Sequence, residues 1–151
     1  MQNRLARFLA SFFYLGFFPV APGSLASLMG ILIYFFLRRY PLFYAAVFIV
    51  ITGVGFVVSD RAEKDAGKKD PSFIVIDEVS GAMIAIFMLP MNPPVVWTAY
   101  FLFRAFDMFK IYPVYKYEKI SGGVGVMMDD IIAGIYTNLF MHLAVRLAGI
   151  V

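Results

Sequence analysis

Long apolar runs separated by short polar breaks are the feature of this sequence that most restricts its fold. The last run, residues 131–150, contains no acid and one arginine. A run of about 20 apolar residues is long enough to cross the hydrocarbon core of a bilayer as a helix. Hydrophobic residue types make up 62% of the chain and its mean hydropathy is +0.81, which is far from the composition of a soluble domain. We therefore expect an integral membrane protein.

The apolar runs predict an all-α bundle of about four to five transmembrane helices, forming one domain over residues 1–151. Lipid offers no hydrogen-bond partners to the backbone, so each span has to be a helix. Helices are expected over residues 5–20, 24–37, 42–58, 73–89, 95–109 and 131–150. The first is expected to be interfacial or re-entrant, because Arg4 and Arg7 open it and a proline-containing break follows it. Ser24 is expected to cap the second.

Charged residues assign the loops to two sides of the membrane. If the helices alternate in direction, one side carries Arg61, Lys64, Lys68, Lys69, Lys110, Lys116 and Lys119, and the other carries Arg38, Arg39 and Arg146. The excess of bases predicts that the first side is cytoplasmic. All ten acids lie at or near that same side. Lysines there would attract anionic lipid to the surface.

Five acids are associated with predicted helices: Asp77 and Glu78 open one apolar span, Asp129 and Asp130 open the last, and Asp107 lies inside a third. Adjacent carboxylates repel each other at the edge of the hydrocarbon region unless a cation lies between them. Small residues follow four positions after three of these acids and would let neighbouring helices approach closely; they are Gly81, Ala133 and Gly134. The other five acids, Asp60, Glu63, Asp65, Asp70 and Glu118, are expected to belong to solvated loops.

These acids predict a divalent-cation site, with Mg²⁺ as the expected ion. Mg²⁺ is usually held by a few carboxylates together with waters and substrate phosphate oxygens. Arg104 and Lys110 lie three residues on either side of Asp107 and are candidates for binding phosphate. An ion-pair ladder of these three residues at a helix end is the alternative interpretation.

A glycine-rich segment precedes the last predicted helix and is a candidate phosphate cradle. Gly122, Gly123 and Gly125 would let backbone N–H groups turn toward an anion close to a helix start. A simple turn is the alternative for these glycines. Ser24 is a further candidate for a hydrogen bond to phosphate, beside its expected capping role.

Missing residue types narrow the chemistry. The chain has no cysteine, and its one histidine, His142, lies about three turns from Asp129 and is expected to be a core residue. Phosphoryl chemistry would therefore use metal ions to polarise phosphate and activate water, or an aspartate as the nucleophile. Both alternatives use the same acids. We expect no nucleic-acid partner, and the sequence makes no prediction of oligomeric state.

Four segments, "PGSLAS" (22–27), "IDEVSG" (76–81), "FRAFDMFK" (103–110) and "GGVGVMMDDIIAG" (122–134), resemble the bacterial phosphatidylglycerophosphate phosphatases of the A type. The resemblance implies a Mg²⁺-dependent enzyme of the bacterial inner membrane that converts phosphatidylglycerophosphate to phosphatidylglycerol and phosphate. It also implies that the metal site uses Asp77, Glu78, Asp107, Asp129 and Asp130, and that the basic residues are Arg104 and Lys110. Catalytic roles are expected for Asp107, Lys110, Asp129 and Asp130.

One departure from the family pattern and two other function classes remain. The family commonly has a proline where this chain has Ile111, a change that affects the loop after Lys110 and leaves the acids in place. A CDP-alcohol phosphatidyltransferase would also need acids and a divalent metal, but its Asp-Gly-x-x-Ala-Arg pattern is absent. A divalent-cation transporter would need acids along a path through the bilayer, whereas these acids stay on one side.

Overall fold

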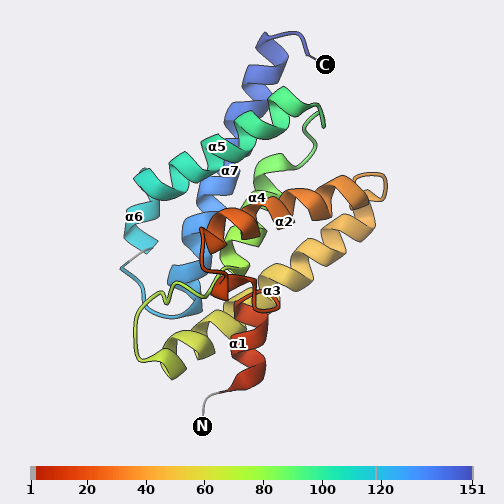
Figure 1. The fold of residues 1–151 in the computed structure, drawn as a ribbon. Coiled ribbons are helices and arrows are strands. Elements are labelled where there is room, and N and C mark those ends of the chain that lie inside the picture. The colour runs from red at the N-terminus through yellow and green to blue at the C-terminus, as the bar shows by residue number, and fades with distance from the viewer. Residues whose placement is uncertain (1–2, 118, 151) are drawn as a thin grey trace.

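The computed structural model describes residues 3–117 and 119–150, and the described chain is helical with no strand. Its elements are α1 (Arg4–Ala10), the 3₁₀ turn η1 (Leu15–Phe17), α2 (Pro22–Leu37), α3 (Pro41–Ala66), α4 (Ile76–Ile86), α5 (Pro93–Phe109), α6 (Val114–Tyr117) and α7 (Gly123–Leu147). The N-terminal segment lies at the bottom of Figure 1, and α7 runs from the lower part of the molecule to the top. The predicted all-α class is confirmed.

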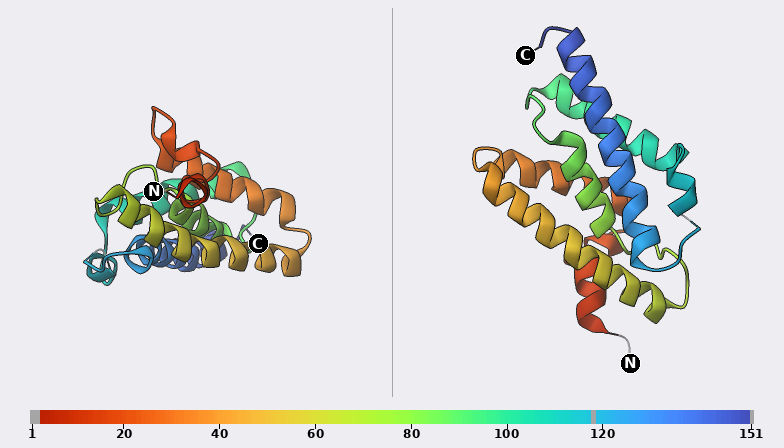
Figure 2. Two further views of the ribbon diagram at one scale, coloured as in Figure 1. Left: turned by 90° about the horizontal axis from the view of Figure 1, so that it is seen from below. Right: turned by 180° about the vertical axis from the view of Figure 1, so that it is seen from behind.

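Helix α4 lies at the centre of the bundle and packs against α2, α3, α5 and α7. All but two of its eleven residues are buried. The view from behind in Figure 2 shows α7 running along α4. Since Asp77 and Glu78 open α4, and Asp129 and Asp130 lie on α7, the packing of these two helices decides how the acids meet.

The central helix is shorter than the sequence predicted. α4 has 11 residues, which corresponds to about 16 Å. The hydrocarbon core of a bilayer is about 30 Å thick, so α4 alone cannot cross it. The predicted helix over residues 73–89 is therefore wrong in its length. It stops at Ile86 because Phe87 leaves the helical conformation and Met88 has a positive φ of 57°.

Two described helices, α3 and α7, are long and apolar enough to span a membrane, judged by length and composition. They contain 26 and 25 residues. α2 is apolar but shorter. The predicted number of four to five spans therefore stays a prediction.

The polar ends of α3 and α7 are helical where the sequence predicted loops. α3 continues past residue 58 to Ala66, and Gly67, whose φ is +61°, follows its last residue. In this added part of the helix, Lys64 and Asp60 lie one turn apart and form an ion pair of 2.7 Å. α7 begins at Gly123 rather than at residue 131. Asp129 consequently lies more than one turn inside α7 and does not open it.

Helix α2 begins two residues earlier than expected. Pro22 takes its first position, where the missing N–H costs no hydrogen bond, and Ala21 precedes it with a φ of 45°. The capping role predicted for Ser24 is therefore wrong. Ser24 instead lies in the first turn of α2.

The N-terminal segment is not one helix over residues 5–20. α1 ends at Ala10, and the next residue, Ser11, is fully buried. The hydroxyl of Ser11 donates to the carbonyl oxygen of Phe8 and accepts from the N–H of Tyr14. These bonds hold a turn between α1 and η1. The interfacial or re-entrant placement of this segment stays a prediction.

His142 is not a core residue. Its side chain is exposed on α7, and its Nε2 lies 3.1 Å from the carbonyl oxygen of Phe87. This contact connects α7 to the chain just after α4, far from the acids that open α4. The argument that His142 lies too far from the acids to act as a phosphoryl nucleophile therefore still holds.

Candidate active site

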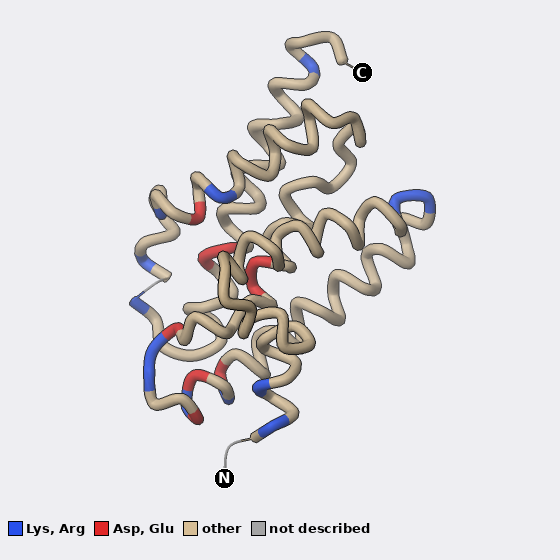
Figure 3. The backbone as a smooth tube through the Cα atoms, in the orientation of Figure 1, with Lys and Arg blue, Asp and Glu red and all other residues tan. Residues whose placement is uncertain are grey.

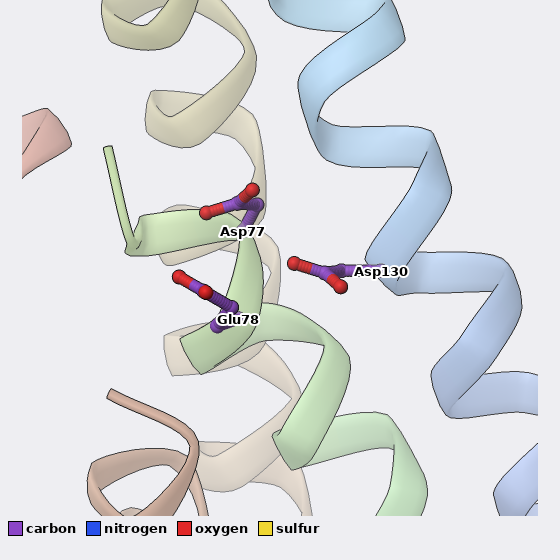
Figure 4. Close-up of side chains that lie close together, drawn as sticks. All are labelled: Asp77, Glu78 and Asp130. Atoms are coloured by element: carbon purple, nitrogen blue, oxygen red, sulfur yellow. The ribbon is translucent and has the colours of Figure 1, made fainter. Parts of the chain in front are cut away.

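Three carboxylates from α4 and α7 come together at the centre of the bundle; those of Asp77 and Asp130 are buried and that of Glu78 is partly buried. One oxygen each of Asp77, Glu78 and Asp130 lies within 4.8 Å of the others. Figure 4 shows Asp130 reaching from α7 toward the adjacent pair on α4. Asp77 is 8% exposed and Asp130 only 2%, so water screens their repulsion poorly. A bound cation would neutralise this cluster.

Glycines set the short distance between the helices that carry these acids. A Cβ atom on Gly81 would lie 2.6 Å from the carbonyl oxygen of Asp130, and a Cβ on Gly134 would overlap the carbonyl oxygen of Gly81. The close packing expected for these small residues is therefore confirmed. Gly23 likewise allows α2 to pack closely on α4, because a Cβ there would overlap the carboxylate of Glu78.

The cluster has oxygens that no hydrogen-bond donor of the described residues satisfies. They are buried and comprise Oδ1 of Asp77, Oε2 of Glu78 and Oδ1 of Asp130. Buried polar atoms are normally hydrogen-bonded, so such oxygens on three neighbouring carboxylates call for another partner. Carboxylate oxygens are the ligands that hard divalent cations prefer. The donor set therefore fits a divalent metal ion.

Two bases from the C-terminal end of α5 border the acid cluster. Nη1 of Arg104 lies 3.0 Å from Oδ2 of Asp107 and 3.6 Å from Oε1 of Glu78. Nζ of Lys110 lies 3.5 Å from Oδ2 of Asp129. The ion-pair ladder that was the alternative interpretation is thus present between Arg104 and Asp107, and Lys110 reaches across to α7. Its φ of 46° at the end of α5 turns the chain there.

These groups face one cavity of about 440 Å³, which we call the acid cavity. Its walls include every acid, base and serine predicted for the site: Ser24, Asp77, Glu78, Arg104, Asp107, Lys110, Asp129 and Asp130. Asp107 and Asp129 line the cavity without belonging to the three-carboxylate cluster. Their roles as metal ligands, like the catalytic roles predicted above, stay predictions.

None of the three predicted cradle glycines lines the acid cavity. A Cβ on Gly123 would overlap the carbonyl oxygen of Phe56, so this glycine allows α7 to pack on α3. The N–H of Gly122 already donates to the carboxylate of Glu63. Gly125 lines a neighbouring cavity. A phosphate-binding role for Gly122 and Gly123 therefore finds no geometric support.

Two acids expected in solvated loops are part of the site's surroundings. Asp70 lines the acid cavity. Glu63 is 7% exposed; its Oε1 accepts from the N–H of Asp70 at 3.1 Å, and its Oε2 accepts from Gly122. Ser59, one turn earlier on α3, is also buried, so both residues lie on the same buried face of the helix. This spacing from Ser59 is the sequence signal that could have indicated the burial of Glu63. Asp65 is exposed as expected, Asp60 is partly buried, and Glu118 lies outside the described residues.

Glu63 connects the loop that supplies Asp70 to Gly122, the residue just before α7. Replacing it with glutamine is expected to remove one of its two hydrogen bonds, because the amide offers a single acceptor atom. We expect a loss of about 1–3 kcal/mol of stability and about tenfold weaker Mn²⁺ binding. Thermal unfolding and metal titration of the purified protein would measure these effects. Asp65→Asn on the same helix is the control, and equal results for both variants would contradict the prediction.

Comparison with known proteins gives consistent matches over most of the chain. The sequence model of a family described as Phosphatidylglycerophosphatase A matches residues 8–145. A Bacteroides thetaiotaomicron protein with the provisional name phosphatidylinositol-3-phosphatase is 39% identical over 138 residues, covering 85% of this chain and 86% of the relative. Proteins named Phosphatidylglycerophosphatase A are 34% identical in Escherichia coli, covering 84% and 76%, and 33% identical in Haemophilus influenzae, covering 85% and 81%. No solved structure matches the chain.

Proposed function

Because the chain belongs to the phosphatidylglycerophosphatase A family and is a phosphatase, we propose that it hydrolyses the terminal phosphomonoester of phosphatidylglycerophosphate. The products would be phosphatidylglycerol and phosphate, in phospholipid biosynthesis. The observation that carries the proposal is the buried cluster of Asp77, Glu78 and Asp130, whose unpaired oxygens border two bases in one cavity. This arrangement suits a substrate that brings phosphate oxygens and needs a cation.

The proposed cofactor is Mg²⁺, held by Asp77, Glu78 and Asp130. Asp107 and Asp129 line the same cavity and are proposed to complete the site together with the substrate. When bound, the ion would supply Lewis-acid polarisation of the phosphate and neutralise charge that develops on its oxygens. The three acids would hold the ion from α4 and α7, and the glycines keep these two helices close together.

The chain's own groups are proposed to bind the phosphate as follows. Arg104 and Lys110 donate charge-assisted hydrogen bonds to phosphate oxygens, exchanging part of their contact with Asp107 and Asp129 for the substrate. Ser24 lines the same cavity and offers a hydroxyl donor from the first turn of α2. The N-terminal end of α2 also favours negative charge.

We further propose a multi-pass protein of the bacterial inner membrane, with the acid cavity at its cytoplasmic face. Figure 3 shows the acids in the centre and at the left and lower left of the molecule, whereas the charged residues of the turn between α2 and α3 at the right are basic. The basic loops around the acids support the cytoplasmic side by the positive-inside rule. The proposal of four to five spans extends beyond α3 and α7 and requires some shorter helices to cross in contact with their neighbours.

A phosphoinositide is the second candidate substrate, because the relative with 39% identity carries the name phosphatidylinositol-3-phosphatase. Both candidate lipids carry a phosphomonoester on a polyol that a phosphodiester joins to diacylglycerol. The acid cavity would bind the monoester in either case. The polyol is therefore the part of the substrate that an assay has to distinguish.

Phosphate release by the purified protein in detergent micelles tests the proposal. With phosphatidylglycerophosphate, we expect release that needs added Mg²⁺ and stops with a chelator, because six acids and only two bases among the described residues line the acid cavity, so a phosphate needs a further cation there. Phosphatidylinositol 3-phosphate is measured in parallel and is expected to react more slowly. Folded protein that releases phosphate from neither lipid would refute a lipid-phosphatase function, and a CDP-linked lipid substrate would then be assayed.

A further inference from the structure

A second cavity adjoins the acid cavity and has a different charge. Its volume is about 450 Å³, and we call it the lysine cavity; it is lined by Lys69, Asp70, Lys119, Gly125, Val126 and Asp129. Three of these residues, Asp70, Val126 and Asp129, also line the acid cavity. The two cavities therefore share a wall.

The two bases of the lysine cavity do not belong to the wall that it shares with the acid cavity. Both acids that line it belong to the shared wall, and Asp129 contacts Lys110 at 3.5 Å. Lys69 and Lys119 line the lysine cavity but not the acid cavity. Lys69 comes from the loop between α3 and α4, and Lys119 from the segment before α7, so the fold brings together two bases 50 positions apart (119 − 69).

Local contacts also determine the shape of the lysine cavity. Nζ of Lys119 lies 5.9 Å from the centre of the Tyr115 ring, a cation–π arrangement that restricts the side chain. Gly125 offers no side chain to fill the space, and a Cβ there would overlap the carbonyl oxygen of Ile120. The result is a hollow that is lined by two lysines and shares Asp70, Val126 and Asp129 with the acid cavity.

We propose that the lysine cavity binds the phosphodiester of the lipid whose phosphomonoester enters the acid cavity. The inference rests on the proposed lipid-phosphatase function and names a recognition site for its substrate. Both candidate lipids carry two phosphates separated by one polyol, and two neighbouring cavities match this pattern. A diester carries a single negative charge, for which two lysines suffice without a metal ion. Lys69 and Lys119 would thus select lipids over soluble phosphomonoesters.

Binding of phosphatidylglycerol tests this site without any turnover, because this lipid has the diester but no monoester. Binding is measured in neutral detergent micelles for the wild type, for Lys69→Gln/Lys119→Gln, and for Lys68→Gln/Lys116→Gln. The last variant removes the same charge, with Lys68 in the same loop as Lys69 and Lys116 on α6 close to Lys119 in the chain, but its lysines do not line the cavity. We expect about tenfold weaker binding in the first double variant than in the second. Equal affinities in the two double variants would overturn the proposal.

Kinetic measurements are a second test, and they distinguish a failure of this site from a failure of the proposed function. The ratio of kcat/KM for phosphatidylglycerophosphate to that for glycerol 3-phosphate is expected to fall about tenfold in Lys69→Gln/Lys119→Gln relative to the control. An unchanged ratio would contradict a diester site. If the wild type released no phosphate from the lipid, the proposed function would fail, whereas the phosphatidylglycerol measurement would still decide whether the lysine cavity binds a phosphodiester.

Discussion

Asp130→Asn is expected to lower phosphate release at least about a hundredfold, the largest effect of any single substitution considered for this protein. Asp130 is the one member of the three-carboxylate cluster that α7 supplies, and it is 2% exposed. Asparagine has nearly the same shape, so the substitution removes charge with little change in packing. The remaining two carboxylates, both from α4, would hold a divalent cation from one side only.

Metal binding distinguishes this explanation from a general loss of structure. Added Mg²⁺ or Mn²⁺ should raise the unfolding temperature of the wild type, because a ligand that binds only the folded state stabilises it. The same addition should have a much smaller effect on Asp130→Asn. Asp65→Asn, which changes an exposed acid on α3, is the control and should behave as the wild type. If Asp130→Asn bound the metal ion as tightly as the wild type, the carboxylate of Asp130 would not be a metal ligand.

Gly81→Ala is expected to destabilise the protein and weaken its cation site together, the second largest effect. The new methyl group would lie 2.6 Å from the carbonyl oxygen of Asp130 and 2.7 Å from the ring of Phe103. Neither can withdraw easily, since Phe103 is fully buried and the carbonyl belongs to the backbone of α7. α4 and α7 would have to separate, at a cost of about 1–3 kcal/mol. That movement also draws Asp77 and Glu78 away from Asp130.

Gly53→Ala provides a matched control for this substitution. Gly53 lies inside α3, and a Cβ atom there would meet no atom within 4 Å. Alanine favours helix over glycine by up to about 1 kcal/mol, so this variant should be as stable as the wild type or more so. We expect a lower unfolding temperature and at least about tenfold weaker Mn²⁺ binding for Gly81→Ala only. If the two variants unfolded and bound metal alike, the close contact between α4 and α7 would not determine the site.

The spacing of residues in the sequence predicted several features that the structure has. Asp77 and Glu78 were expected at the start of a helix, and α4 does begin at Ile76. Gly81 and Gly134 were expected on faces that permit close packing, and each lies against the other helix. Helical periodicity is a local property, so the faces of one helix can be derived from its own residues.

Other features could not be derived from local patterns. The helix over residues 73–89 was predicted too long because apolar composition does not show where Phe87 and Met88 leave the helical conformation. Glu63 was assigned to a solvated loop because its partners, the N–H groups of Asp70 and Gly122, come from other parts of the chain. Such contacts depend on which elements lie side by side.

The sequence by itself determined the class of protein, the family and the set of acids and bases available to the site. Composition shows that the chain is apolar, the length of its apolar runs favours helices, and the motifs around Asp77, Asp107 and Asp130 supply the acids and bases. Only the tertiary structure decided that three of the five acids form one cluster while Asp107 and Asp129 lie beside Arg104 and Lys110. The physical reason is that the spacing within each helix is fixed locally, whereas the distance between helices depends on packing across the whole bundle.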